Sequence, residues 1–180
     1  MSRSVEVLQA GVQTLNTLPA GRAEEQLATC CAARAWVARV VAGRPYADLD
    51  ELLTVSDRAI QELGPDDLAE ALAAHPRIGQ RVGGSSTEAA WSRQEQSGMD
   101  DADAEVRAAL REGNVAYEER FDQVFLIRAA GRSAAEMLAE LHRRLASDPA
   151  DERAEVTEQR EVAEQLRQIT RLRLERLLQS

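Results

Sequence analysis

The stretch GPDDLAEALAAHPRIG, residues 64–79, contains a complete helix with its start and its stop. Pro65 suits the first turn because its missing amide hydrogen would have no partner there, and the acidic pair that follows complements the helix dipole. The helix must end near Ala74, because Pro76 disfavours helical geometry at the preceding residue, His75. The stretch therefore predicts a short helix that delivers a histidine to a rigid corner.

The rest of the chain has the same pattern, helix after helix with Gly and Pro between them. Ala, Leu, Glu and Arg dominate, whereas aromatic residues make up 3% and β-branched residues are sparse, which argues against a large sheet. The predicted fold is all-α, a compact bundle of roughly eight helices in a single domain over residues 1–180. Besides the helix above, the predicted helices span about 5–15, 23–42, 50–63, 85–98, 100–121, 133–145 and 148 to the end.

Local signals predict how several of these helices begin. Asp50 is the expected N-cap of its helix, either Ser85 or Ser86 is the expected N-cap of the helix over 85–98, and Ser133 with Glu136 forms a capping-box pattern. Residues 148–149, Asp-Pro, are expected to begin the last helix. Residues 124–130 form an apolar run without a helical period, which predicts an extended or irregular segment.

The charge of the chain limits its partners. A net charge of −9 repels nucleic-acid phosphates and anionic lipid heads, so neither nucleic acid nor a membrane is an expected partner. No signal-peptide pattern, no apolar run of membrane-spanning length and no address tail is visible, which predicts a cytoplasmic protein.

The two cysteines, Cys30 and Cys31, are adjacent, and a disulfide between consecutive residues is strained. We interpret them as small apolar residues on a packed helix. The sequence contains no phosphate-binding glycine loop and no metal-ligand spacing, so no metal and no cofactor is expected.

The chain has two histidines, and they differ in setting. His142 stands in a strongly charged part of a helix and is expected on the surface. His75 is held at a corner between a helix end and Pro76, where it can point into a cleft and transfer a proton near neutral pH. The alternative is a structural histidine that only ends the helix.

A second candidate group follows on the helix predicted over 85–98. Ser92, Glu95 and Gln96 are spaced i, i+3 and i+4, so they share one helix face. A hydroxyl, a carboxylate and an amide on one face can bind a small ligand rich in hydrogen-bonding groups. The alternative is an ordinary solvated face.

At these residues the sequence resembles the OHCU decarboxylases (2-oxo-4-hydroxy-4-carboxy-5-ureidoimidazoline decarboxylases). The family pattern His-Pro-x-Ile-Gly, followed by Ser-x-x-Glu-Gln, corresponds to residues 75–79 and 92–96. Further similarity lies in Arg44-Pro45-Tyr46, in Asn114-x-x-Tyr117-x-x-x-Phe121, in residues 125–127 with 131–133, and in Leu172-Arg173-Leu174.

The resemblance implies an all-helical, commonly dimeric enzyme of urate degradation that decarboxylates OHCU to (S)-allantoin without a cofactor. It implies a small ureidoimidazoline substrate, with His75 as the proton donor and with Ser92, Glu95 and Gln96 binding and orienting the substrate. Because an ionised carboxylate accepts hydrogen bonds only, we also expect Glu95 to act as the second catalytic residue, at the substrate hydroxyl. The arginine of the last helix is expected to be Arg173, with Arg171 as the alternative. The residues implied to bind or enclose the substrate are Pro76, Ser92, Gln96, Ile127, Arg128, Ala129, Ala130, Gly131 and Arg173.

Two positions depart from the family pattern. Asp122 stands where the family usually has Gly, and Arg128 stands where it more often has a small or apolar residue. These departures leave room for a related enzyme that acts on another ureide or purine-derived anion. A helical interaction module without chemistry is a further alternative, and an exposed apolar stripe would distinguish it.

Overall fold

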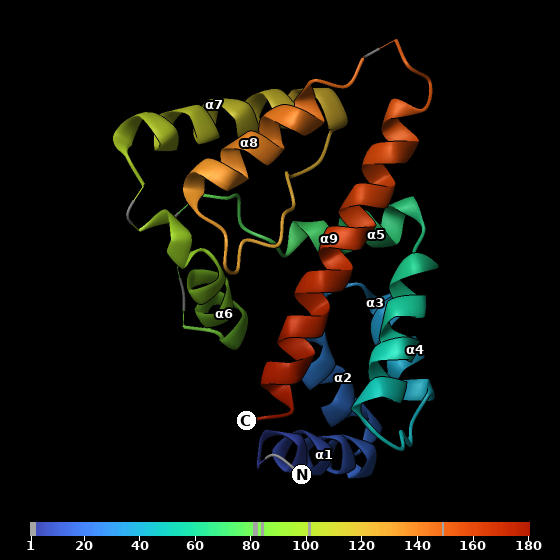
Figure 1. Ribbon diagram of the computed structural model, residues 1–180. Helices are drawn as coiled ribbons and strands as arrows, with labels where there is room; N and C mark the ends of the chain where they lie inside the picture. Colours follow the sequence, from blue (N-terminus) through green and yellow to red (C-terminus); the bar gives the residue numbers. More distant parts are fainter. Residues whose placement is uncertain (1–2, 81–82, 84, 101, 149) are drawn as a thin grey trace. The chain divides into compact units, whose positions relative to one another are not determined.

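The structure is a computed structural model that describes residues 3–80, 83, 85–100, 102–148 and 150–180. Over these residues it contains nine α-helices, one 3₁₀ turn and no strand (Figure 1). The all-α prediction is confirmed. The chain divides into two compact units, Met1–Ala71 with Leu166–Ser180, and Leu72–Gln165, which we describe in turn. The single domain expected over residues 1–180 stays a prediction.

The first unit is built around α3, which packs against both α2 and α4, while α1 packs against α4. Trp36 of α3 is fully buried, and its indole nitrogen donates a hydrogen bond to the Ser56 hydroxyl of α4 at 3.2 Å. The helices of this unit are α1 (Arg3–Thr17), α2 (Ala20–Ala28), α3 (Arg34–Ala42), α4 (Leu49–Gln61), most of α5 (Pro65–Ala73) and the second half of α9 (Ala154–Leu177).

The prediction of one helix over 23–42 is wrong, because α2 ends at Ala28 and α3 begins only at Arg34. Cys30, Cys31 and Ala33 are all at most 1% exposed. Successive residues of a helix point 100° apart, so one continuous helix would turn part of this group toward solvent. The break buries all of them. No Gly or Pro marks it in the sequence, and it makes the helix count one higher than predicted.

Two predicted helix starts are also shifted. Asp48, rather than Asp50, is the N-cap of α4, and its carboxylate accepts a hydrogen bond from the Glu51 amide at 2.9 Å. The last helix begins at Ala154, after a non-helical turn, and not at 148–149. Of that dipeptide, Pro149 lies outside the described residues.

Both cysteines are expected to be unreactive in the folded protein. Cys30 and Cys31 are at most 1% exposed, and burial raises the pKa of the Cys31 thiol to about 11. A thiol with a raised pKa stays neutral at pH 8, and the thiolate is the reactive form. Titration with a thiol reagent should find no fast-reacting group in the native protein and both groups after denaturation. A fast-reacting thiol in the native state would contradict this packing.

The second unit contains α6 (Thr87–Glu95), the turn η1 (Ser97–Met99), α7 (Ala104–Phe121) and α8 (Ala134–Leu145). It also contains the end of α5 and the first half of α9. α7 and α8 lie side by side (Figure 1). The buried apolar cluster of this unit consists of Ile78, Met99, Leu110, Tyr117, Phe125, Ile127, Ala129, Ala134, Met137 and Leu141.

Several local predictions are confirmed in this unit. Ser86 caps α6, and Ser133 and Glu136 form the predicted capping box of α8. Residues 124–130 are irregular, without helix or strand geometry. His142 is exposed on α8, as expected of a surface histidine.

Asp122 ends α7 in the left-handed conformation, with φ +51°. This geometry costs an L-residue roughly 1–2 kcal/mol, less for Asp, and costs Gly nothing. Replacing Asp122 by Gly therefore removes a conformational cost from the folded state. It also raises the conformational entropy of the unfolded chain, which lowers the free energy of unfolding by about 0.4–1 kcal/mol. We therefore expect Asp122→Gly to raise the melting temperature by a few degrees, roughly 2–4 °C per kcal/mol.

Thermal unfolding followed by circular dichroism tests this prediction. Asp122→Ala is the matched control, because Ala gains no freedom at positive φ and should lower the melting temperature. A Gly variant that melts below the parent protein would show that the Asp122 carboxylate stabilises the helix end by more than its strain.

Candidate active site

The predicted histidine corner is present in the second unit. α5 ends at Ala73, and the amide of His75 donates to the Leu72 carbonyl at 2.9 Å, which closes the last turn. Gly79 then has φ +80°, a conformation that a side chain would strain, and it turns the chain back toward α6. His75 and Pro76 are both half-buried. The corner therefore holds the imidazole on a backbone that is constrained on both sides.

Neutral hydrogen bonds from two side chains, Gln96 and Asn114, fasten this corner to the neighbouring helices. The Gln96 side-chain oxygen, at the end of α6, accepts from the Gly79 amide at 2.9 Å. The Asn114 side-chain nitrogen, on α7, donates to the Ile78 carbonyl at 3.1 Å. Asn114 is 3% exposed, so its bond is shielded from water. The corner is held from α6 and from α7 at once.

An ion pair adds a third connection from the corner to α7. The Arg77 guanidinium donates to both carboxylate oxygens of Glu118, at 2.5 and 2.6 Å. This hydrogen bonding holds the pKa of Glu118 below its ordinary value. Sequence reasoning missed both Asn114 and Glu118 as supports of the corner. The only available signal was the place of Asn114 in the Asn-x-x-Tyr motif.

The face predicted on α6 is largely removed from solvent. Ser92 is 4% exposed and Glu95 is 8% exposed, while Gln96 is half-buried. This burial contradicts the alternative of an ordinary solvated face. A buried carboxylate and a buried hydroxyl on one helix face are typical of a site that binds a polar ligand.

A hollow of about 340 Å³ joins the corner to α6. His75, Pro76 and Ser92 line it together, and these are three of the predicted site residues. Glu95 is not among its lining residues and follows Ser92 by one helical turn. The other lining residues are Ala73, Ala74, Gln80, Gly83, Ser86, Glu88 and Ala89. The volume is at the small end of ligand pockets and suits a small ring.

The predicted substrate-enclosing segment, Ile127–Gly131, lies in the same unit but does not line this hollow. Ile127 and Ala129 are buried in the apolar cluster, whereas Arg128 and Ala130 are half-buried. Gly131 has φ +79° and leads into α8.

Two contacts fix where this segment runs. The Arg128 amide donates to the Gln165 side-chain oxygen at 2.9 Å. A Cβ on Gly98 would lie 2.0 Å from the Arg132 carbonyl oxygen, so the chain just after the segment touches the turn that follows α6. Only Gly permits this approach. The segment thus passes close to the end of the helix that carries Ser92 and Glu95.

Arg173 lies in the first unit, on α9, and is 4% exposed. Its alternative, Arg171, is already engaged, because its guanidinium donates to both oxygens of Asp57 at 2.7–3.0 Å. Arg167 also contacts Asp57, at 3.1 Å. Arg167 and Arg171 thus both pair with Asp57 within the first unit, and the choice of Arg173 over Arg171 stays a prediction.

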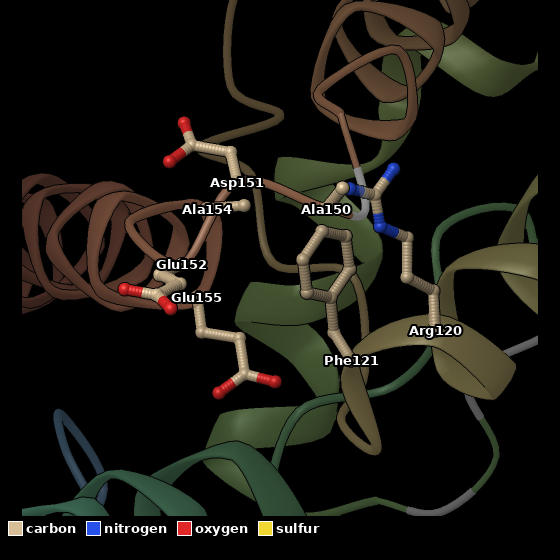
Figure 2. A pocket seen from close by; sticks show the side chains of 7 residues that line it. All are labelled: Arg120, Phe121, Ala150, Asp151, Glu152, Ala154 and Glu155. Carbon is tan, nitrogen blue, oxygen red and sulfur yellow. The ribbon is translucent and has the colours of Figure 1, made fainter.

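A separate hollow of about 410 Å³ lies in the second unit, away from the predicted site residues (Figure 2). Arg120 covers the Phe121 ring there, with 4.8 Å between the guanidinium carbon and the ring centre. The remaining lining residues are Ala150, Asp151, Glu152, Ala154 and Glu155. The lining thus combines a cation stacked on an aromatic ring with three carboxylates.

Among the helices of the described residues, none combines the length and the hydrophobicity that a membrane span requires. Over the same residues, no group of three or more His, Cys, Asp or Glu side chains is placed to hold a metal ion.

The sequence model of one protein family, OHCU decarboxylase, matches residues 16–175. The chain belongs to the OHCU decarboxylase family. This confirms the resemblance inferred from the histidine and glutamate motifs, and family members named as decarboxylases are carboxy-lyases, which was the predicted enzyme class. It also removes support from the alternative of a helical module without chemistry.

Curated relatives of this family member include a protein of uric acid degradation and two OHCU decarboxylases. A uric acid degradation bifunctional protein of Arabidopsis thaliana is 28% identical over 158 residues, which are 86% of this chain and 47% of that protein. The chain thus spans about half the length of that relative. The OHCU decarboxylases of Haloferax volcanii and Amia calva are 27% and 30% identical, each over 79% of its own length, with 77% and 79% of this chain covered.

Solved structures agree with the family assignment. A crystal structure of an OHCU decarboxylase in the presence of (S)-allantoin matches with a TM-score of 0.72 and 26% identity, over 87% of this chain and 99% of that one. A crystal structure of (S)-allantoin synthase matches with a TM-score of 0.63 and 17% identity, over 91% of this chain and 52% of that one. The second match shows the shared fold alone.

Proposed function

We propose that this family member decarboxylates 2-oxo-4-hydroxy-4-carboxy-5-ureidoimidazoline to (S)-allantoin, without a cofactor, in urate degradation. One observation of the structure carries the proposal: His75 and Ser92 line a single small hollow, with Glu95 one helical turn further along the same helix. The relatives named as OHCU decarboxylases support the substrate.

The substrate supplies its own electron sink. Its carboxylate is attached to a ring carbon that neighbours a carbon–nitrogen double bond. When the bond to the carboxylate breaks, CO₂ leaves and the electron pair moves toward that double bond, whose nitrogen takes up a proton. The hydroxyl then loses its proton to become a carbonyl, and the neighbouring ring carbon gains one. The protein only needs to orient the ring and transfer protons.

In this proposal, His75 delivers the proton to the ring carbon from one side and so sets the (S) configuration. Glu95, when ionised, accepts hydrogen bonds only, which suits the removal of the hydroxyl proton. Pro76, Ser92 and Gln96 orient the ring. We further propose that the segment from Ile127 to Gly131 encloses the substrate and that Arg173 pairs with an anionic group.

The test uses OHCU generated freshly from urate with uricase and hydroxyisourate hydrolase. Addition of the purified protein should accelerate decay of OHCU and produce the circular dichroism signal of (S)-allantoin. Decay at the spontaneous rate with a racemic product would reject the proposed function.

We also propose that the enzyme is a cytoplasmic homodimer. The dimer is supported by the resemblance noted in the sequence, and the cytoplasmic location is the expectation stated in the sequence analysis. Light scattering coupled to gel filtration should give twice the chain mass of 19.8 kDa. Fractionation of cells that produce the protein should recover it with cytoplasmic markers, and a monomer mass or a secreted product would reject the corresponding part.

A further inference from the structure

A buried ion pair lies at the centre of the second unit. Arg144 of α8 and Glu158 of α9 have side chains that are 1% and 7% exposed, and Nε of Arg144 donates to the Glu158 carboxylate at 2.8 Å. The Tyr117 hydroxyl, on α7, accepts from Arg144 at 3.0 Å and donates to Glu158. This buried cluster therefore joins three helices.

One nitrogen of the same guanidinium is directed at the main chain of the irregular segment. Nη1 of Arg144 donates to the Leu126 carbonyl at 2.7 Å. The guanidinium carbon also lies 4.7 Å from the centre of the Phe125 ring. Leu126 directly precedes the segment Ile127–Gly131, so the cluster fixes the point at which that segment begins.

The energetics of such a cluster favour a positioning role over a stabilising one. Removing two charges from water costs about as much as their attraction returns, so a buried pair contributes little net stability. A guanidinium with fixed donor directions does, however, define where its acceptors lie. The Leu126 carbonyl has no strand partner to define its direction, because the described residues around it form no sheet.

We propose that Arg144 is a positioning residue that sets the path of Ile127–Gly131, acting through the Leu126 carbonyl with Tyr117 and Glu158 as its supports. The consequence for catalysis rests on the proposed function, in which this segment encloses the substrate. If Arg144 loses its guanidinium, the hydrogen bond to the Leu126 carbonyl is lost. The segment Ile127–Gly131 should then move while the helices stay folded.

Two variants test the proposal. Arg144→Lys keeps the positive charge but loses the planar guanidinium with its several N–H donors. Tyr117→Phe removes only a hydroxyl and keeps the aromatic ring, whose centre lies 5.3 Å from that of Phe125. If the lysine variant folds poorly, the phenylalanine variant alone still tests the proposal. Hydrogen exchange should become faster at the amides of residues 125–131 in both variants, and KM for OHCU should rise on the order of 10-fold to 100-fold with a smaller change in kcat.

Arg120→Lys is the matched control. Arg120 also carries a guanidinium that stacks on an aromatic ring, that of Phe121 (Figure 2). It donates to a main-chain carbonyl as well, that of Leu145. That carbonyl belongs to the end of α8 and not to the segment. The control should leave both KM and the exchange of residues 125–131 unchanged.

Three outcomes would overturn the proposal: unchanged exchange at 125–131 in both variants, a fall in kcat alone with KM unchanged, or an equal rise in KM for Arg120→Lys. A fall in kcat alone is what a purely structural role produces, because it lowers only the fraction of folded enzyme. If the parent protein does not decarboxylate OHCU, the proposed function fails, and the exchange measurement still decides whether Arg144 positions the segment.

Discussion

His75→Asn is expected to lower kcat for OHCU decarboxylation by roughly 10²–10⁴-fold, the usual contribution of a positioned acid or base. Asparagine preserves a polar side chain at the corner but cannot transfer a proton near neutral pH. The backbone should stay in place, because the side chains of Gln96 and Asn114 bind the main chain of the corner. Steady-state kinetics with freshly generated substrate measures the loss.

His142→Asn is the matched control for this prediction, since His142 is the second histidine of the chain and is exposed on α8. The control variant should retain the parental rate. The product of the His75 variant is also informative, because any remaining allantoin should lose its (S) excess when water replaces the imidazole as proton donor. A His75 variant with a near-parental rate and full optical activity would exclude the imidazole from proton delivery.

Glu95→Gln is expected to lower kcat by roughly 10²-fold, near the lower end of what general acid–base groups contribute. Glutamine has nearly the same shape, so the packing of a side chain that is 8% exposed is preserved. It cannot, however, accept a proton from the substrate hydroxyl. The loss should therefore appear mainly in kcat, with a smaller change in KM.

Glu112→Gln makes the same chemical change at an exposed position of α7 and should leave the kinetics unchanged. Circular dichroism spectra and melting temperatures of both variants show whether a loss of rate reflects unfolding. If Glu95→Gln keeps the parental kcat at an unchanged melting temperature, the carboxylate only fills space in the helix face.

The sequence predicted those parts of the fold that depend on residues close together in the chain. The helix that ends before His75, the cap at Ser86 and the capping box at Ser133 depend on side chains within a few residues of the atoms they bond. The break between α2 and α3 was missed for the opposite reason. It is set by the burial of Cys30 and Cys31 in the tertiary structure, and no Gly or Pro among residues 29–33 signals it.

The candidate site divides in the same way. His75 and Ser92 were predicted as site residues from motifs, and the structure places both beside one hollow. The supports of the site join residues far apart in the chain: Asn114 bonds a carbonyl 36 residues away, and Glu118 pairs with an arginine 41 residues away. No periodicity or spacing predicts such pairs, because they form only when α7 packs against the corner.

The three connections that hold the histidine corner differ in how they respond to ionic strength. The bonds from Gln96 and Asn114 are neutral, so dissolved ions leave them almost unaffected. The ion pair is screened, because Arg77 and Glu118 have side chains that are 52% and 25% exposed. The imidazole should therefore keep its place in concentrated salt. Any salt sensitivity of turnover then reports on how the anionic substrate is attracted to the enzyme.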